Sequence, residues 1–174
     1  MQSYSTFWLL GPTSSGKTTI AKRCSNQLRS MNYQCLHYDG DEIRDVFGPN
    51  FGFAEENRAQ VVQLLTYLAR KGNEAGVNVL ISALTAHQSA REYVKNNIPN
   101  LKICYVSCPI TECISRDPKG LYKKALAGEI KNFTGLDSPF EESENPFIEL
   151  RTHEKDLETC KNELVEIVLK EIQL

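Results

Sequence analysis

One short segment, residues 11–18 with the sequence GPTSSGKT, constrains the fold more than any other part of the chain. It matches the pattern G-x-x-x-x-G-K-[ST], directly follows an apolar run at residues 7–10 and directly precedes a stretch of helical character. In that context the pattern is a phosphate-binding loop, in which backbone N–H groups of the loop and the helix N-terminus face phosphate oxygens. The sequence therefore predicts a nucleotide-binding α/β protein.

The rest of the chain alternates short apolar runs with helical segments. Strands are expected at residues 6–10, 33–38, 77–82 and 101–107, and helices at residues 16–28, 58–71, 89–96, 110–115 and 155–172. This alternation predicts right-handed crossovers and a mostly parallel sheet of five strands or fewer, covered on both faces in a three-layer α/β fold. No linker or repeat interrupts residues 1–174, which are expected to form a single domain that binds ligands beyond the carboxyl ends of its strands.

Composition excludes several other classes of protein. The chain has 20 Lys plus Arg against 22 Asp plus Glu, which disfavours a domain that coats nucleic acid. No apolar run is long enough for a membrane span, and the first five residues lack the positive region of a secretory signal. Six cysteines without a Cys-x-x-Cys pair are expected to be reduced, buried thiols; a metal site at residues 104, 108 and 113 is the disfavoured alternative. We therefore expect a cytoplasmic protein without nucleic-acid or membrane partners.

The phosphate-binding loop predicts ATP and Mg²⁺ as cofactors. Lys17 brings a positive charge to the β- and γ-phosphates, and the hydroxyl of Thr18 is a ligand for Mg²⁺. The residues expected to contact ATP in this region are Gly11, Ser14, Ser15, Gly16, Lys17, Thr18 and Thr19.

Two carboxylates, Asp39 and Asp41, follow the second expected strand. Such a pair can serve Mg²⁺ or accept a proton from an attacking hydroxyl. Asp-Gly is also a common turn pair, but this architecture places its site at strand ends, which favours a functional role. The guanine-recognition sequence Asn-Lys-x-Asp is absent from the chain, so a small-molecule kinase is favoured over a GTPase.

The chain changes character at about residues 116–147. The segment from 117 to 147 holds three prolines, three glycines and many charges. A basic, glycine-containing segment after the fourth strand suits a mobile lid that closes over phosphates and expels water. A solvated surface loop is the alternative for a charged run of this kind.

These features together resemble the adenylylsulfate kinase family. The resemblance rests on residues 11–18, on residues 39–41 with Arg44, on the Phe-Gly-Phe at residues 51–53 and above all on residues 116–141. It extends from residue 7 to about residue 152. It implies a P-loop kinase fold, a homodimer, and transfer of the γ-phosphate of Mg·ATP to the ribose 3′-hydroxyl of adenylyl sulfate, which gives 3′-phosphoadenylyl sulfate.

The resemblance also implies a role for each matching residue. Asp41 would be the base on the 3′-hydroxyl, Asp39 would support the metal with Thr18, and Lys17 and Lys119 would act on the transferring phosphoryl group. Arg116 would bind on the ATP side with Lys119 during lid closure. The acceptor would be held by stacking side chains and by arginines, with the candidate residues Arg44, Phe53, Arg58, Thr85, Lys119 and Phe133.

The departures from the family pattern fall on the acceptor side. After Arg58 the family usually has Glu-Asn-Ile-Arg-Arg, so Val61 replaces an asparagine and Gln63 an arginine. After the third strand the family reads roughly Phe-Ile-Ser-Pro-Tyr-Arg, where this chain has Ala-Leu-Thr-Ala-His-Gln at residues 83–88. Only Arg91 keeps its match further on.

Two interpretations of these departures stay open. Drift is one, because Val61 shares an apolar helical stripe with Leu64, Leu65 and Leu68. The other is a different acceptor nucleotide, such as cytidine diphosphoramidate in capsule biosynthesis, to which His87 could hydrogen-bond. An inactive, regulatory nucleotide-binding homologue is a third possibility, disfavoured because the lysine and the acidic pair are kept.

A set of cations is expected to converge on one cleft: Lys17, Arg44, Arg58, Arg91, Arg116, Lys119, Lys123 and Lys124.

Overall fold

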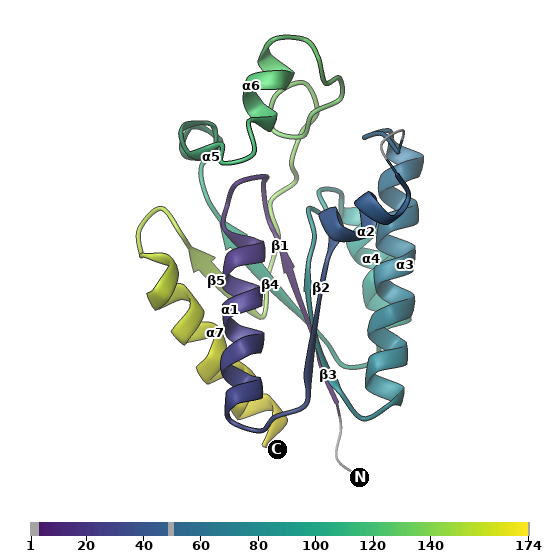
Figure 1. The fold of residues 1–174 in the computed structure, drawn as a ribbon, viewed down its shortest axis with the longest axis vertical. Helices are drawn as coiled ribbons and strands as arrows, with labels where there is room; N and C mark the ends of the chain where they lie inside the picture. The colour runs from purple at the N-terminus through teal and green to yellow at the C-terminus, as the bar shows by residue number, and fades with distance from the viewer. Residues whose placement is uncertain (1–3, 49–50, 174) are drawn as a thin grey trace.

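The computed structural model describes residues 4–48 and 51–173. Its centre is a sheet of five parallel strands in the order β2-β3-β1-β4-β5 (Figure 1). The strands are β1 (Thr6–Leu10), β2 (Cys35–Asp39), β3 (Asn78–Ser82), β4 (Leu101–Ser107) and β5 (Ile148–Arg151). The expected mostly parallel sheet is therefore confirmed.

Helices cover both faces of this sheet. Those of the described residues are α1 (Lys17–Ser30), α2 (Gly40–Val46), α3 (Glu55–Glu74), α4 (Gln88–Asn97), α5 (Ile110–Arg116), α6 (Leu121–Leu126) and α7 (Leu157–Ile172). In Figure 1, α1 and α7 lie on one side of the sheet and α3 and α4 on the other. This arrangement confirms the three-layer α/β fold.

Strand β1 shows how the sequence builds the two cores. All five of its residues are buried, and successive side chains of a strand point to opposite faces. Phe7 and Leu9 accordingly pack with apolar residues of α1 and α7, whereas Trp8 and Leu10 pack with those of α3 and α4. A strand buried on both faces needs the unbroken apolar run that the sequence supplies before the phosphate-binding loop.

Three parts of the structure differ from the sequence expectation. Residues 40–46, where no helix was expected, form the helix α2, because the Asp39 carboxylate accepts hydrogen bonds from the first free amides of the helix. The short strand β5 extends the sheet beyond β4. The expected loop at residues 117–147 contains the helix α6, and its Tyr122 and Phe133 form a small core with Cys108 and Cys113, which precede the loop.

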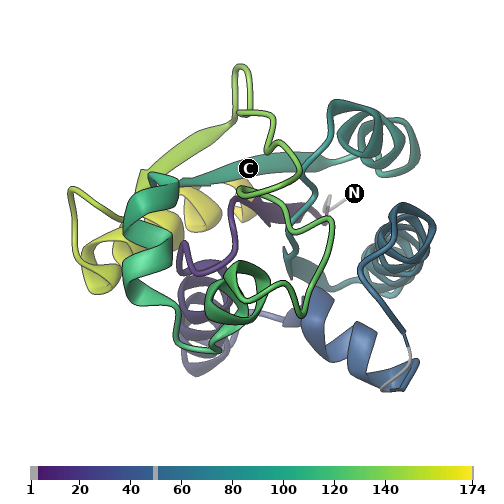
Figure 2. The ribbon, with the colours of Figure 1, turned by 90° about the horizontal axis from the view of Figure 1, so that it is seen from above.

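This lid segment lies at the carboxyl end of the sheet. Figure 2, which looks onto that end, shows α5, α6 and the segment after α6 lying across it. The ring centroids of Tyr122 and Phe133 are 4.9 Å apart in an edge-on contact, and both side chains are buried. The lid is therefore anchored by a small hydrophobic core, which the count of prolines, glycines and charges did not reveal.

The six cysteines are unpaired and buried, which confirms their interpretation as small apolar side chains. In the part of the chain that the structure describes, no helix has the length and apolar character that crossing a membrane requires.

Candidate active site

The phosphate-binding loop joins β1 to α1, and two of its glycines are required by space and backbone conformation. A Cβ atom at Gly11 would lie 2.3 Å from the carbonyl oxygen of Val106, a fixed backbone atom of β4. Gly16 caps α1 with a φ of 102°, and a Cβ there would lie 2.8 Å from the Leu157 side chain. The loop therefore packs against the end of the sheet in a conformation that only glycine permits at these two positions, and it leads directly into the N-terminus of α1, the end of a helix that favours an anion.

Lys17, the first residue of α1, extends back under this loop. Its Nζ donates to the carbonyl oxygen of Gly11 at 2.9 Å and to that of Pro12 at 2.5 Å. Burial lowers the pKa of Lys17 to about 8, although the nearby Asp41 and Asp39 carboxylates act in the opposite direction. Its ammonium group is thus desolvated and aimed at the position that phosphates take in such loops.

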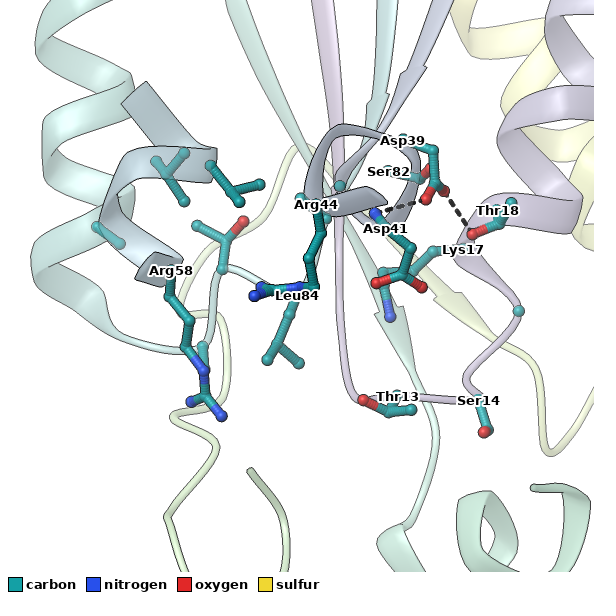
Figure 3. Close-up of a pocket in the computed structure, with 18 of the residues that line it drawn as sticks. Thr13, Ser14, Lys17, Thr18, Asp39, Asp41, Arg44, Arg58, Ser82 and Leu84 are labelled. Atoms are coloured by element: carbon teal, nitrogen blue, oxygen red, sulfur yellow. Dashed lines mark hydrogen bonds between the residues drawn. The ribbon is translucent and has the colours of Figure 1, made fainter. Parts of the chain in front are cut away.

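Asp39, at the end of β2, links the helix α1 to the end of β3. Its Oδ2 accepts from Thr18 Oγ1 at 2.6 Å and from Ser82 Oγ at 2.5 Å, and its Oδ1 accepts from the amide of Asp41 at 2.8 Å (Figure 3). Burial opposes ionisation of this carboxyl, but these hydrogen bonds outweigh it and lower its pKa. An ionised carboxylate beside the Thr18 hydroxyl is a donor set that fits Mg²⁺.

Asp41 lies in the first turn of α2 and faces the same space. Its Oδ2 lies 2.6 Å from Nζ of Lys119, which the segment between α5 and α6 supplies. Burial lowers the pKa of Lys119, but the hydrogen bond and charge of Asp41 outweigh it and leave that pKa raised. The structure therefore brings the predicted base and a predicted lid residue into direct contact.

Arg44 of α2 and Arg58 of α3 extend into the cavity on the side away from the loop (Figure 3). The Arg44 guanidinium donates to the carbonyl oxygen of Gly52 at 2.5 Å and lies 4.8 Å from the ring of Phe53. Arg58 donates to Thr134 Oγ1 in the lid at 2.6 Å. The Nε atoms of both arginines are buried without a partner among the described residues, which leaves each with donor capacity for an anionic ligand.

A single cavity of about 810 Å³ collects most of the predicted residues. Those that line it are Ser14, Gly16, Lys17, Thr18, Thr19, Asp39, Asp41, Arg44, Arg58, Thr85, Arg116 and Lys119. Gly11, Ser15, Phe53 and Phe133 are not among the lining residues. Phe133 is only 3% exposed within the lid core, so the two phenylalanines do not form a stacking slot in this structure, and their role stays a prediction.

The expected convergence of eight cations is wrong for three of them. Arg91 is 2% exposed and directs its guanidinium at backbone carbonyls, while Lys123 and Lys124 project from α6 into solvent. All three are absent from the residues that line the cavity. Helical spacing and loop position did not reveal these directions, because they depend on how the lid packs.

The residues that depart from the family pattern lie in or beside the cavity wall. Val61 is 4% exposed and packs in the core while one surface of it reaches the cavity, as its position on the apolar stripe predicted. Gln63 and His87 line the cavity. Gln88 does not line the cavity, and its backbone N–H donates to the Glu141 carboxylate at 2.6 Å.

Sequence reasoning missed the wall of the cavity near Arg116. That arginine donates to Thr152 Oγ1 at 3.1 Å and to the Thr152 carbonyl oxygen at 2.6 Å. Thr152, Lys155, Asp156 and Leu157 line the cavity beside it. They follow β5, and because β5 was not predicted, the rule that sites lie beyond strand ends could not be applied there.

A parallel sheet, a phosphate-binding loop with its lysine, an acidic pair at a strand end and a basic lid define a P-loop kinase. The sequence model of the adenylylsulphate kinase family matches residues 3–151, and the chain belongs to this family.

Relatives and solved structures agree with this assignment. The probable adenylyl-sulfate kinase of Archaeoglobus fulgidus is 40% identical over 149 residues, 86% of this chain and 96% of that protein. The adenylyl-sulfate kinase of Rippkaea orientalis is 40% identical over 162 residues, 93% of this chain and 88% of that protein. The APS kinase of Mycobacterium tuberculosis, solved with AMPPNP and APS, superposes with a TM-score of 0.90 at 28% identity and covers 98% of this chain and 99% of its own. Shikimate kinase from Acinetobacter baumannii, at 15% identity and a TM-score of 0.65 over 97% and 95% of the two chains, shares the fold alone.

Proposed function

We propose that this protein is an adenylyl-sulfate kinase that transfers the γ-phosphate of ATP to the ribose 3′-hydroxyl of adenylyl sulfate. The observation that carries the proposal is the position of Asp41, in one cavity with the loop lysine Lys17 on one side and Arg44 and Arg58 on the other. Membership of the family and the names of its relatives support the same donor and acceptor.

In the proposed reaction, Asp41 accepts the proton of the 3′-hydroxyl as its oxygen bonds to the γ-phosphorus. The bond from that phosphorus to the β–γ bridging oxygen breaks, and ADP leaves with the electron pair. Lys17 stabilises the charge that develops on the phosphoryl oxygens, for which its ammonium must exchange the carbonyl oxygens of Gly11 and Pro12 for phosphate.

Mg²⁺ fits this scheme through the donors that the structure shows. Thr18 and Asp39 would hold the ion, and a bound Mg²⁺ supplies positive charge that offsets the charge on the phosphates. We expect Lys119 to leave Asp41 when the acceptor hydroxyl takes its place and to turn toward the transferring phosphoryl group, as a mobile lid residue can. A homodimer and a cytoplasmic location stay predictions.

A different acceptor nucleotide is the second candidate, because Val61, Leu84 and Ala86, three apolar residues, line the cavity that holds Arg58, and Glu55, which also lines it, adds no positive charge. Each charge-assisted hydrogen bond to an anionic tail is worth about 1.5–3 kcal/mol of binding free energy. An acceptor with a less anionic tail would therefore lose the least binding free energy in a cavity that lacks some of these bonds. Cytidine diphosphoramidate is one nucleotide of this kind.

A nucleotide panel separates these possibilities. Release of ADP from ATP and Mg²⁺ is measured with adenylyl sulfate and with cytidine diphosphate derivatives, and the products are analysed. Preferential turnover of adenylyl sulfate supports the proposal, and preferential turnover of a cytidine nucleotide supports the second candidate. If none of the acceptors stimulates ADP release, the chain is an inactive nucleotide-binding homologue and the proposal is wrong.

A further inference from the structure

Arg91 on α4 carries a buried positive charge that the proposed reaction does not use. Its side chain is among the largest that are fully buried, and it lies outside the cavity. Its guanidinium donates to the carbonyl oxygens of Thr85 at 3.0 Å, Ala86 at 3.1 Å and Glu142 at 3.0 Å, and also to that of Glu141. A guanidinium has five N–H groups in a fixed fork, so it can join several backbone carbonyls that no other side chain could join at once.

These carbonyls belong to two segments that are far apart in the sequence. One is the loop after β3, residues 83–87, which lines the cavity through Thr85, Ala86 and His87. The other is the end of the lid, residues 140–142. The amide of Glu141 donates to the carbonyl oxygen of Ala86 at 3.1 Å, and the Arg91 guanidinium lies 5.4 Å from the ring of Phe140. Arg91 therefore stands where the cavity wall and the end of the lid meet.

The cavity wall at this point has a backbone conformation that needs support. Thr85 has a φ of 40°, in the left-handed region that is unfavourable for a β-branched residue. Arg91 holds its carbonyl group, and the indole N–H of Trp8 donates to its hydroxyl at 2.9 Å. Contacts from the buried side chains of Trp8 and Arg91 thus hold Thr85 in this conformation, in which Thr85, Ala86 and His87 line the cavity.

We propose that Arg91 is a positioning residue for the acceptor: it holds residues 85–87 in the shape that the acceptor requires and ties that wall to the end of the lid. The inference rests on the proposed function, because it assigns this end of the cavity to the acceptor. Loss of Arg91 would therefore weaken acceptor binding and leave the ATP side, around Lys17 and Arg116, unchanged.

Steady-state kinetics of Arg91→Met and Arg91→Lys test this role. The matched control is Lys95→Gln, which removes an exposed cation from the same helix. For Arg91→Met we expect KM for the acceptor to rise about tenfold, as the loss of hydrogen bonds from a charged group implies, while KM for ATP stays within about twofold. Arg91→Lys keeps the charge but not the fork, so its KM for the acceptor should lie between those of Arg91→Met and the wild type. Equal rises in both KM values would overturn the proposal.

Trp8 gives a second measurement that does not depend on turnover. It is the single tryptophan of the chain, so its fluorescence reports directly on the bond to Thr85. Thr85→Val, which removes the hydroxyl and keeps the branched shape, defines the spectral change that loss of this bond causes. Arg91→Met is expected to show a change of the same sign, and emission identical to that of the wild type would contradict a positioning role.

If Arg91→Met does not fold, Arg91→Lys and Glu141→Ala still decide the question. Glu141 is exposed, and its carboxylate accepts from the backbone N–H of Gln88 at the start of α4, so its removal loosens the same junction without creating a cavity. It should raise KM for the acceptor in the same direction by a smaller factor, and an unchanged KM in both variants would overturn the proposal. If wild-type protein phosphorylates none of the acceptors, the proposed function fails, whereas the Trp8 spectra alone still decide whether Arg91 shapes the cavity wall.

Discussion

Nζ of Lys119 lies 2.6 Å from Oδ2 of Asp41, across 78 positions of the chain. The pair joins the lid to the first turn of the helix that follows β2, and both side chains are about half exposed. An exposed ion pair is weak, so the contact can break when a substrate hydroxyl approaches Asp41. The lid and the candidate base are thus in contact in this structure, and the proposed reaction has Lys119 leave Asp41 when the acceptor hydroxyl takes its place.

Replacement of Lys119 tests whether this contact serves catalysis or stability. Lys119→Ala should change the free energy of unfolding by less than about 1 kcal/mol, because the pair is exposed. It should lower kcat about a hundredfold, because a cation for the transferring phosphoryl group is lost. Thermal unfolding and ADP release measure the two effects. Lys123→Ala, at an exposed lysine of α6 outside the cavity, should change neither.

Removal of the candidate base should separate binding from chemistry. Asp41→Asn is expected to lower kcat by about two to four orders of magnitude, the range for loss of a general base. The dissociation constant for ATP should change little, and titration calorimetry measures it. Asp45→Asn, at an exposed acid of the same helix, should retain full activity. Unchanged turnover of Asp41→Asn would rule out its role as the base.

ATP binding should take up protons at mildly alkaline pH. The pKa of Lys17 is about 8 in this structure, so above that pH its side chain is largely neutral. Bound phosphates favour the ammonium form and raise this pKa, so ATP binding above about pH 8 must protonate Lys17. The affinity of the protein for ATP must therefore fall as pH rises. Calorimetry at pH 8.5 in buffers of different ionisation enthalpy should show net proton uptake, and identical enthalpies in all buffers would contradict the assignment.

Asp39 should contribute stability that is lost in acid. Its pKa in the folded protein is below the ordinary value of 3.8, so the stabilisation is fully present above that pH and is lost as pH falls through the folded value. Asp39→Asn should therefore have a lower free energy of unfolding than the wild type at pH 7, and this difference should become smaller below about pH 4. Urea unfolding at both pH values measures it; a gap that is independent of pH would contradict the ionised, hydrogen-bonded state.

The sequence was most informative where local chemistry decides the structure. The apolar run at residues 7–10 predicted β1, and residues 11–18 predicted the loop and the start of α1. The structure adds the reason for Gly11, which packs against the Val106 carbonyl where no side chain fits. Asp39 was placed correctly at a strand end, and turn chemistry was the disfavoured alternative for the Asp39-Gly40 pair; no helix was expected there. The helix α2 forms because the carboxylate caps it, and sequence alone does not show which of the two roles such a pair takes.

Side-chain direction and long-range packing could not be predicted. Arg91 matches the family in position, yet its guanidinium turns away from the cavity toward the carbonyls of residues 85, 86, 141 and 142. Phe133 lies in a lid core that forms only when it meets Tyr122. Strand β5 is four residues long and is held by its pairing with β4, a contact between segments some 44 residues apart that no local pattern encodes.

Product analysis with ATP, Mg²⁺ and adenylyl sulfate tests the proposed function most directly. The proposal predicts one equivalent of ADP for each adenylyl sulfate consumed and a product that carries the new phosphate on the ribose 3′-oxygen. The same assay with Asp41→Asn, at equal ATP occupancy, should give almost none of this product. ADP release that is independent of the acceptor, or a phosphate on another oxygen, would contradict it.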